Sequence, residues 1–389
     1  MKSNSFLWIF VIFSLSFAQD DRFMKSRQQF ALDLFKNTPV TTSFLISPLS
    51  LDYVMNLLFL GTTKTTFTAV KAGLKYPKDF TIKAIEDNLL KWSKSVKMIN
   101  DVEVATKIYV NNSLTIKKAY KMSIKKILNS DLEKIAFIKS KPATTKINKW
   151  ISDATRDMIQ NMIGPGVIDK STLMILVNCI YFSGKWTDPF LSEFNYEGNF
   201  TTEDGSTKST EFMYQEVKLN YSSSVDELKG ASAVSLNYED TSVSMVFVLP
   251  PKGSNLKLWL SSIKSINWAA VDKSLEPTNV KLSIPKFNIT FETDMRTPLE
   301  NMGLESIFEN NVYLAKMFTG QNAKMTNLLH KTLLRVDEIG TVAVGVAALV
   351  AKTSSFLLPI NQQEFTANRP FVFFIRSGQT LIFIRQYVG

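Results

Sequence analysis

Apolar residues recur with the spacing of an amphipathic helix in five segments of the first half of the chain. These segments are residues 25–37, 48–61, 82–97, 117–128 and 144–162. The second starts at Ser47-Pro48-Leu49-Ser50, and the last stops at the breaker sequence Gly164-Pro165-Gly166. We expect a helix over each of the five.

Strand patterns dominate the second half. Residues 171–182 (STLMILVNCIYF) are continuously apolar with β-branched content, which is typical of a central strand buried on both faces. Residues 102–110 alternate as a strand does. Further strands are expected over residues 231–238, 242–250, 279–291, 331–339, 371–375 and 380–384. A helix-rich first half and a strand-rich second half, with no linker or repeat between them, predict one α+β domain.

The stretch from Glu338 to Ala351 has the composition of a strand but a position suited to a loop. After Glu338 it contains no charge, no proline and no large aromatic residue. With the two-residue period of a strand, one face is almost entirely small and the other is largely β-branched. The small face consists of Thr341, Ala343, Gly345, Ala347 and Leu349. Such a segment suits insertion into a narrow slot between strands; an ordinary buried strand or part of a core helix are the alternatives.

Residues 1–18 have the features of a secretory signal peptide. They carry one lysine, an apolar run from Phe6 to Phe13 and small residues at Ser16 and Ala18. A membrane anchor is disfavoured because the apolar run is too short to span a bilayer. We expect a secreted, extracellular protein whose single domain covers residues 19–389.

Four glycosylation sequons agree with secretion. Their acceptor residues are Asn111, Asn199, Asn220 and Asn288. The only cysteine, Cys179, cannot form an internal disulfide, and its apolar surroundings favour a buried structural thiol.

The net charge of +10 favours acidic partners. Five lysines cluster along the helix expected over 117–128, where they form either a solvated face or a site for a sulfated glycan. They are Lys117, Lys118, Lys121, Lys125 and Lys126. Secretion and the lack of any nucleic-acid-binding motif argue against DNA or RNA as a partner.

The sequence offers no catalytic constellation. One histidine and one cysteine exclude a zinc site built from those residues, and no other metal site or cofactor is expected. No Gly-x-Ser-x-Gly, P-loop or dinucleotide motif is present. Asp337 and Glu338 are adjacent in a strand, so they point to opposite faces and form no acid–base pair. We therefore do not expect an enzyme.

Five motifs in order make the chain resemble the serpins, and specifically a secreted, insect-like member. They are Ser47-Pro48-x-Ser50, LVNCIYFSGKWTDPF (176–190), SIPKF (283–287), HKTLLRVDEIGT (330–341) and ANRPFVFFI (367–375). The resemblance implies a serpin fold with three β-sheets, one of them a large central mixed sheet. It also implies about nine helices and an exposed reactive-centre loop at about residues 339–364.

The resemblance further implies a suicide-substrate inhibitor of an extracellular serine protease. The protease cleaves the loop and becomes trapped as an acyl-enzyme while the loop inserts into the central sheet. The hinge would be Glu338, Gly340, Thr341, Ala343, Gly345 and Ala347. Counting forward from Glu338 places the reactive bond at Ser354–Ser355; counting back from Phe365 places it near Phe356, and Lys352 is a further alternative.

Two polar clusters follow from the same resemblance. Ser47, Ser50, Asn178 and His330 match the shutter cluster beneath the central sheet, where strands part during insertion. Trp186, Lys286 and Glu338 match the breach cluster at the top of the sheet, where we expect a Glu338–Lys286 ion pair.

A second function remains open. Val342 stands where inhibitory members usually carry an acidic residue, and Val344 and Val346 stand where they carry alanine. These departures favour a non-inhibitory carrier or binding protein with the same fold. In either case the protein is expected to be a monomer that binds neither membrane nor nucleic acid.

Overall fold

The computed structural model describes residues 4–38, 43–100, 102–240, 242–309, 312–320, 325, 328–341 and 362–389. For residues 4–20 it gives the course of the backbone only. Within these ranges there are nine α-helices. They are α1 (Asn4–Asn37), α2 (Pro48–Gly61), α3 (Lys64–Gly73), α4 (Ile82–Lys97), α5 (Lys118–Leu128), α6 (Ser140–Ala154), α7 (Leu256–Ser262), α8 (Trp268–Ser274) and α9 (Arg296–Asn301).

All five helices expected from the sequence are present, and α3, α7, α8 and α9 are additional. The start of α2 has a clear cause: the Ser47 side chain accepts a hydrogen bond from the Ser50 amide, and Pro48 occupies the first turn. In the helices that the structure describes, no segment combines the length and the hydropathy needed to cross a bilayer.

The helix expected over residues 144–162 is wrong at its C-terminal end, because α6 stops at Ala154. The hydroxyl of Thr155 donates to the carbonyl of Ile151, and Arg156 and Asp157 adopt left-handed backbone angles that end a helix. The apolar spacing continues past this point because the next residues, among them Ile159 and Met162, remain buried in an irregular segment.

The described strands are β1 (Phe44–Ile46), β2 (Val102–Asn111), β3 (Asp131–Ile135), β4 (Met174–Phe182), β5 (Gly184–Lys185), β6 (Tyr196–Thr201), β7 (Thr207–Val225), β8 (Ala231–Asn237), β9 (Val243–Leu249), β10 (Glu276–Pro285), β11 (Phe287–Asp294), β12 (Leu328–Val336), β13 (Gly340–Thr341), β14 (Gln363–Thr366), β15 (Phe371–Ser377) and β16 (Thr380–Tyr387). The single strand expected over 279–291 is two strands, β10 and β11, which lie in different sheets on either side of Lys286.

Seven strands form a mixed central sheet in the order β3-β2-β4-β12-β13-β5, with β11 beside β12. Strand β4 is buried at every residue, as its continuous apolar run predicted. It runs parallel to β12, but the two pair directly only where Leu176–Cys179 face Leu328–Lys331. Farther along, β13 lies between β12 and β5. At one end of the central sheet, β4 and β12 are thus hydrogen-bonded to each other. At the other end, the short strand β13 lies between β12 and β5.

The remaining nine strands are one hydrogen-bonded sheet in the order β1-β16-β15-β9-β8-β7-β10-β14, with β6 beside β7. The resemblance implied three sheets, whereas the described strands form two. The cause is β7, whose 19 residues pair with β6 and β10 along most of their length and with β8 at their end. Strand β7 therefore joins the strands of two expected sheets into one.

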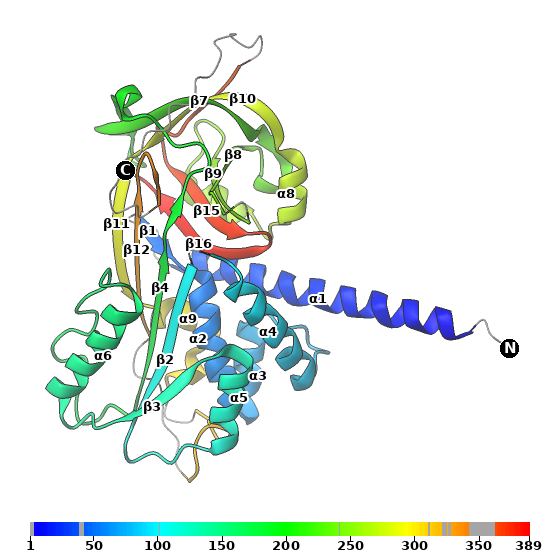
Figure 1. The fold of residues 1–389 in the computed structure, drawn as a ribbon, viewed down its shortest axis with the longest axis vertical. Coiled ribbons are helices and arrows are strands. Elements are labelled where there is room, and N and C mark those ends of the chain that lie inside the picture. The colour runs from blue at the N-terminus through cyan, green and yellow to red at the C-terminus, as the bar shows by residue number, and fades with distance from the viewer. Residues whose placement is uncertain are drawn as a thin grey trace.

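Two separate hydrophobic clusters lie on opposite faces of the central sheet. The larger cluster contains the fully buried helix α2 and the inner faces of both sheets. The smaller one lies under α6 and includes Ile147, Ile151, Tyr109, Val177 and Cys179. In Figure 1, α6 accordingly lies on one side of strands β2 and β4, and α2 to α5 lie on the other.

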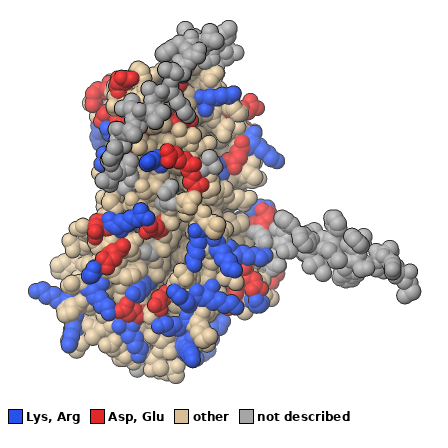
Figure 2. Space-filling model, in the orientation of Figure 1, with Lys and Arg blue, Asp and Glu red and all other residues tan. Residues whose placement is uncertain are grey.

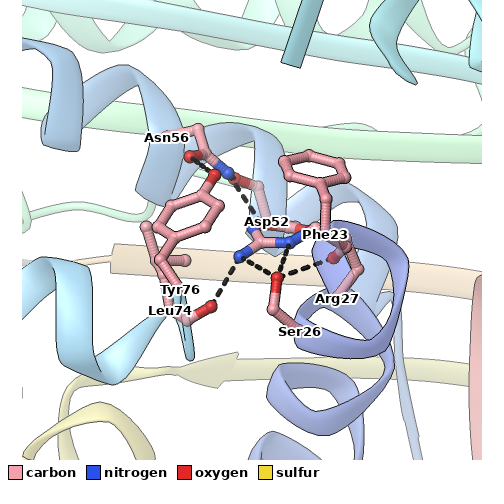
Figure 3. Close-up of polar contacts among 7 residues, drawn as sticks. All are labelled: Phe23, Ser26, Arg27, Asp52, Asn56, Leu74 and Tyr76. Atoms are coloured by element: carbon pink, nitrogen blue, oxygen red, sulfur yellow. Dashed lines mark hydrogen bonds and ion pairs between the residues drawn. The ribbon is translucent and has the colours of Figure 1, made fainter. Parts of the chain in front are cut away.

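A buried polar network ties α1 to α2 and to the end of α3 (Figure 3). The Arg27 guanidinium forms an ion pair with Asp52 and lies 4.1 Å from the Tyr76 ring centroid. The amide of Asn56 donates to Asp52 and accepts from the Tyr76 hydroxyl. Because its buried members satisfy one another, this network fixes the position of α1 against α2.

Arg385 lies in the core of β16 without a carboxylate partner among the described residues. Its side chain is 2% exposed, and its guanidinium carbon lies 4.4 Å from the Phe287 ring centroid and 4.8 Å from that of Tyr387. Its Nε and Nη1 atoms make no hydrogen bond within the described part. Burial lowers the pKa of Arg385 to about 9. The aromatic rings are therefore the main compensation for this desolvated cation.

Candidate functional site

The hinge begins with a tight reversal of the chain after β12. The amide of Asp337 donates to the carbonyl of Gly340, and the Asp337 carboxylate accepts from the amides of Ile339 and Gly340. Beyond this turn, β13 runs antiparallel to both of its neighbours, pairing with Val336 on one side and with β5 on the other. The first residues of the small-faced segment therefore already form a strand inside the central sheet.

Thr341 is completely buried at this position. Its hydroxyl lies 2.7 Å from that of Tyr238, in a geometry in which either group donates. The Tyr238 ring stacks on Trp186 with centroids 4.5 Å apart, and the Trp186 indole donates to the carbonyl of Asp337. The end of β8, the residue after β5 and the hinge thus form one packed unit.

Two glycines are required where β13 meets β5. A Cβ atom on Gly340 would lie 2.1 Å from the carbonyl oxygen of Gly184, which is backbone and cannot turn aside. A Cβ atom on Gly184 would lie 2.6 Å from the Tyr238 ring. The two strands approach too closely here for any side chain.

The expected ion pair is present: Lys286 Nζ lies 2.9 Å from the carboxylate of Glu338. The side-chain amide of Asn195 also donates to Glu338, at 2.6 Å, and to Glu211 at 3.0 Å. Partial burial acts to raise the pKa of Glu338, but the bonds from Lys286 and Asn195 outweigh it and hold that pKa below its ordinary value. Trp186 is held beside this pair through the backbone: its amide donates to the carbonyl of Ile339, the residue after Glu338.

The four residues of the shutter cluster lie together beneath the central sheet. The Ser47 amide donates to Nε2 of His330, and the Ser47 hydroxyl donates to the carbonyl of Ile382 in β16. The Asn178 amide donates to the carbonyl of Ser50, and Asn178 and His330 are register partners across β4 and β12. These bonds hold the start of α2 against β4 and β12 at the end of the sheet where these two strands pair.

His330 is fully buried, and its surroundings keep the imidazole neutral. Desolvation lowers the pKa of His330 to about 3. Because Nε2 accepts the bond from Ser47, the proton of the neutral ring must reside on Nδ1. Nδ1 and the Asn178 Oδ1 atom both lack a hydrogen-bond partner within the described part.

Five residues of these clusters were not identified from the sequence. Tyr238 and Asn195 join the breach cluster, Asp337 forms the hinge turn, and Thr106 and Thr332 extend the shutter cluster through bonds to Asn178 and to the carbonyl of Leu45. The Asp337 turn is local, but the contacts of the other four residues join positions that lie 72 to 287 residues apart, so no local sequence pattern indicates them.

Several expected site residues lie outside the described residues. These are Ala343, Gly345 and Ala347 of the hinge and the four reactive-bond candidates Lys352, Ser354, Ser355 and Phe356, together with the rest of 342–361.

Three of the four sequon asparagines, Asn199, Asn220 and Asn288, are exposed on strands. Asn111 is only half-exposed; its amide donates to the carbonyl of Thr172 and its oxygen accepts from the amide of Ser113.

The five lysines of the expected basic face are all exposed on or beside α5. Lys121 has a loose contact with Asp131, at 3.6 Å. Lysine side chains of α4, among them Lys94 and Lys97, are exposed on the neighbouring helix, and Figure 2 shows Lys and Arg gathered over this helical half. Among the described residues, no group of His, Cys, Asp and Glu is arranged to hold a metal ion.

Comparison with known proteins gives matches over nearly the whole chain. The family model described as "Serpin (serine protease inhibitor)" matches residues 25–388. Leukocyte elastase inhibitor of Sus scrofa is 27% identical over 363 residues, which cover 90% of this chain and 93% of the relative. Antichymotrypsin-2 of Bombyx mori is 26% identical, covering 90% and 92%.

Solved structures agree. The thermophilic serpin tengpin in its native state superposes with a TM-score of 0.84 at 26% identity, covering 94% of each chain. Human thyroxine-binding globulin complexed with thyroxine has the same TM-score at 20% identity, covering 95% of this chain and 99% of that one, and shows a shared fold.

Proposed function

Because this chain belongs to the serpin family, we propose that it is a secreted suicide-substrate inhibitor of an extracellular serine protease and acts as a monomer. The observation that carries the proposal is β13: the two hinge residues Gly340 and Thr341 already occupy a strand position between β12 and β5. A loop that continues from Thr341 has its insertion path set before any cleavage. The similarity to leukocyte elastase inhibitors supports inhibition of proteases in general.

The chemical step belongs to the protease. Its serine oxygen attacks the carbonyl of the scissile residue, the amide bond breaks, and the new amino end leaves with the C-terminal fragment. The other product is an ester that joins the protease to the loop. Release from its C-terminal anchor then lets the loop extend from Thr341 as a strand, with the protease attached.

Insertion requires β4 and β12 to separate. Their direct pairing covers only four residue pairs, from Leu328↔Leu176 to Lys331↔Cys179. A strand placed between them regains backbone hydrogen bonds on both edges. The shutter bonds of Ser47 and Asn178 lie at this seam, so they must be exchanged as the strands part, and a buried bond left unmade costs about 1–3 kcal/mol.

The reactive bond remains a choice among three positions. We favour Ser354–Ser355, which suits an elastase-like protease. Lys352 suits a trypsin-like enzyme and Phe356 a chymotrypsin-like one.

A non-inhibitory carrier or binding role is the second candidate. Val342 favours it, because a β-branched residue stiffens the segment that must insert.

Secretion and glycosylation are part of the proposal. The leader pattern of residues 1–18 supports export, and the exposure of Asn199, Asn220 and Asn288 supports glycans there. A glycan on Asn111 would have to be attached to the same amide nitrogen that donates to the carbonyl of Thr172. A sulfated glycan is the proposed ligand of Lys117, Lys118, Lys121, Lys125 and Lys126.

One experiment tests the central proposal. The mature protein is mixed with trypsin, chymotrypsin and leukocyte elastase, and the products are analysed on denaturing gels and by mass spectrometry. A complex that survives denaturation supports inhibition, and the first residue of the small fragment identifies the reactive bond. Cleavage without a complex and without a gain in thermal stability would favour the carrier.

A further inference from the structure

An open hollow lies on the nine-stranded sheet beside the strand that follows the loop. Its volume is about 540 Å³, and its walls come from β6, β7, β10, β14 and the short turn before β6. It is lined by Phe194, Tyr196, Tyr214, Lys281, Ser283, Glu364 and Thr366. Neither the breach nor the shutter cluster contributes a residue to this surface.

Two aromatic side chains are left facing solvent at the hollow. Phe194 is 50% exposed and Tyr196 is 41% exposed, the latter stacked on the buried ring of Phe212. Exposed aromatic side chains grouped on one surface are typical of protein–protein contacts, because they bury a large area at little conformational cost.

The segment that supplies Phe194, Tyr196 and Tyr214 is acidic, whereas the wall from β10 adds Lys281. Residues 187–217 contain seven acidic side chains and one lysine, a balance of −6 in a chain whose net charge is +10. All seven acids are exposed, as is Glu364 on β14. The acids are Asp188, Glu193, Glu197, Glu203, Asp204, Glu211 and Glu216.

The hollow lies within reach of a protease engaged on the loop. Strand β14 begins at Gln363, nine residues after Ser354, and a chain of that length spans at most about 30 Å. The side chain of Gln362 donates to Glu216, so the chain leaving the loop is held against this face. A protease bound within that reach would have this surface beside it.

We propose that this hollow is a docking surface for the target protease and that it selects proteases whose surface around the active site is basic. The inference rests on the proposed inhibitor function. Phe194 and Tyr196 supply the apolar contact, and the exposed carboxylates of Glu364 and of Glu216, which is bonded to Tyr214, draw a basic partner into place. Charges at a rim act mainly on the rate of association.

The proposed docking surface and the net charge of the chain predict opposite effects on the association rate of a basic protease. A chain of +10 repels a basic protease, whereas the acidic face attracts one. Trypsin and lysine-acetylated trypsin are suitable probes, because they share a specificity and differ in surface charge. Lys352 is the only lysine or arginine between Thr341 and Ala367, so cleavage there reports attack on the loop.

The measurement is the second-order rate constant for loss of intact chain through attack at Lys352, in 50 mM NaCl. We expect native trypsin to react about threefold to tenfold faster than acetylated trypsin. The variant Glu216→Gln with Glu364→Gln should remove this preference. The control, Glu305→Gln with Glu309→Gln, makes the same change in charge at exposed positions beside α9 and should keep it.

A third variant tests the apolar contact: Phe194→Ala should slow both forms of trypsin about equally. The proposal is overturned if acetylated trypsin reacts as fast or faster, or if the face and control variants behave alike. The rate is defined whether trypsin is trapped or only cleaves the chain. The fraction of trypsin that is trapped therefore tests the proposed inhibition. The ratio of the rate constants for native and acetylated trypsin tests the docking surface.

Discussion

The hydroxyl groups of Tyr238 and Thr341 lie 2.7 Å apart in the protein interior. Tyr238 follows β8 of the nine-stranded sheet, and Thr341 is the last described residue of the hinge. This one contact therefore joins the second sheet to the point from which the loop would insert. Its loss should alter the hinge before it alters the rest of the fold.

Tyr238→Phe removes only the hydroxyl, which is the side-chain partner of the Thr341 hydroxyl among the described residues. Since Thr341 is fully buried, we expect the free energy of unfolding to fall by about 1–2 kcal/mol. Trp186 stacks on the ring, so its fluorescence reports the local change. Urea titrations of both proteins provide the measurement. A variant as stable as the wild type, with an unchanged fluorescence spectrum, would show that the contact contributes nothing to stability.

Thr341→Arg should convert an inhibitor into a substrate. An arginine cannot enter the space between β12 and β5 at low cost, because a buried unpaired charge is strongly unfavourable. We expect the fraction of protease trapped to fall nearly to zero while cleavage of the loop continues. Thr341→Ser, which keeps the hydroxyl, serves as the control. Full trapping by the arginine variant would refute loop insertion as the mechanism.

The patterned elements could be predicted from the sequence, and the long-range contacts could not. The continuous apolar run of β4 and the Ser47-Pro48 start of α2 have local causes, so both were predicted correctly. The end of α6 was missed because backbone angles at Arg156 and Asp157, rather than hydrophobic spacing, terminate the helix.

The same division holds for the site. Glu338 and Lys286 were paired through family motifs, yet nothing near Tyr238 or Asn195 in the sequence indicates that their side chains reach the hinge more than 100 residues away. The merging of two expected sheets depends on the length of β7, and the sequence pattern did not predict that strand.

The Glu338–Lys286 ion pair should stabilise the protein in a pH-dependent way. The pKa of Glu338 is lower in the folded protein, so its contribution is present above the ordinary glutamate pKa and is lost as pH falls through the lowered value. Because the pair is partly exposed, we expect Glu338→Gln to cost about 0.5–1 kcal/mol at pH 7 in low salt. Unfolding midpoints at two salt concentrations check this: the difference should shrink as salt rises.

His330 should make the protein sensitive to mild acid. Its pKa is about 3 when folded against an ordinary value of 6.5, so stability is complete above pH 6.5 and declines as pH falls toward 3. The slope should be about 1.4 kcal/mol per pH unit. His330→Gln, which cannot take up the proton, should show a flatter profile of urea midpoints between pH 7 and 5. Parallel profiles would contradict the neutral buried imidazole.

Replacing Arg385 by methionine should leave stability unchanged or raise it by about 1–3 kcal/mol. Methionine keeps much of the packing against Phe287 and Tyr387 without a desolvated charge. Arg385→Ala should lower stability, because it leaves a cavity. Thermal melts of the two variants separate charge from packing. A methionine variant that melts as low as the alanine one would mean that the cation–π contacts outweigh the cost of burial.

The small hydrophobic cluster under α6 has a chemical consequence. It encloses Cys179, the only thiol of the chain, with its sulfur 3.8 Å from that of Met162 and its pKa raised by burial to about 12. In the closed protein this thiol should be inert toward alkylating reagents. Cys179 belongs to β4, and its register partner Lys331 belongs to β12, so it lies where the two strands would separate in the proposed mechanism. The rate at which an alkylating reagent labels Cys179 would thus measure how fast the central sheet opens, without any engineered probe.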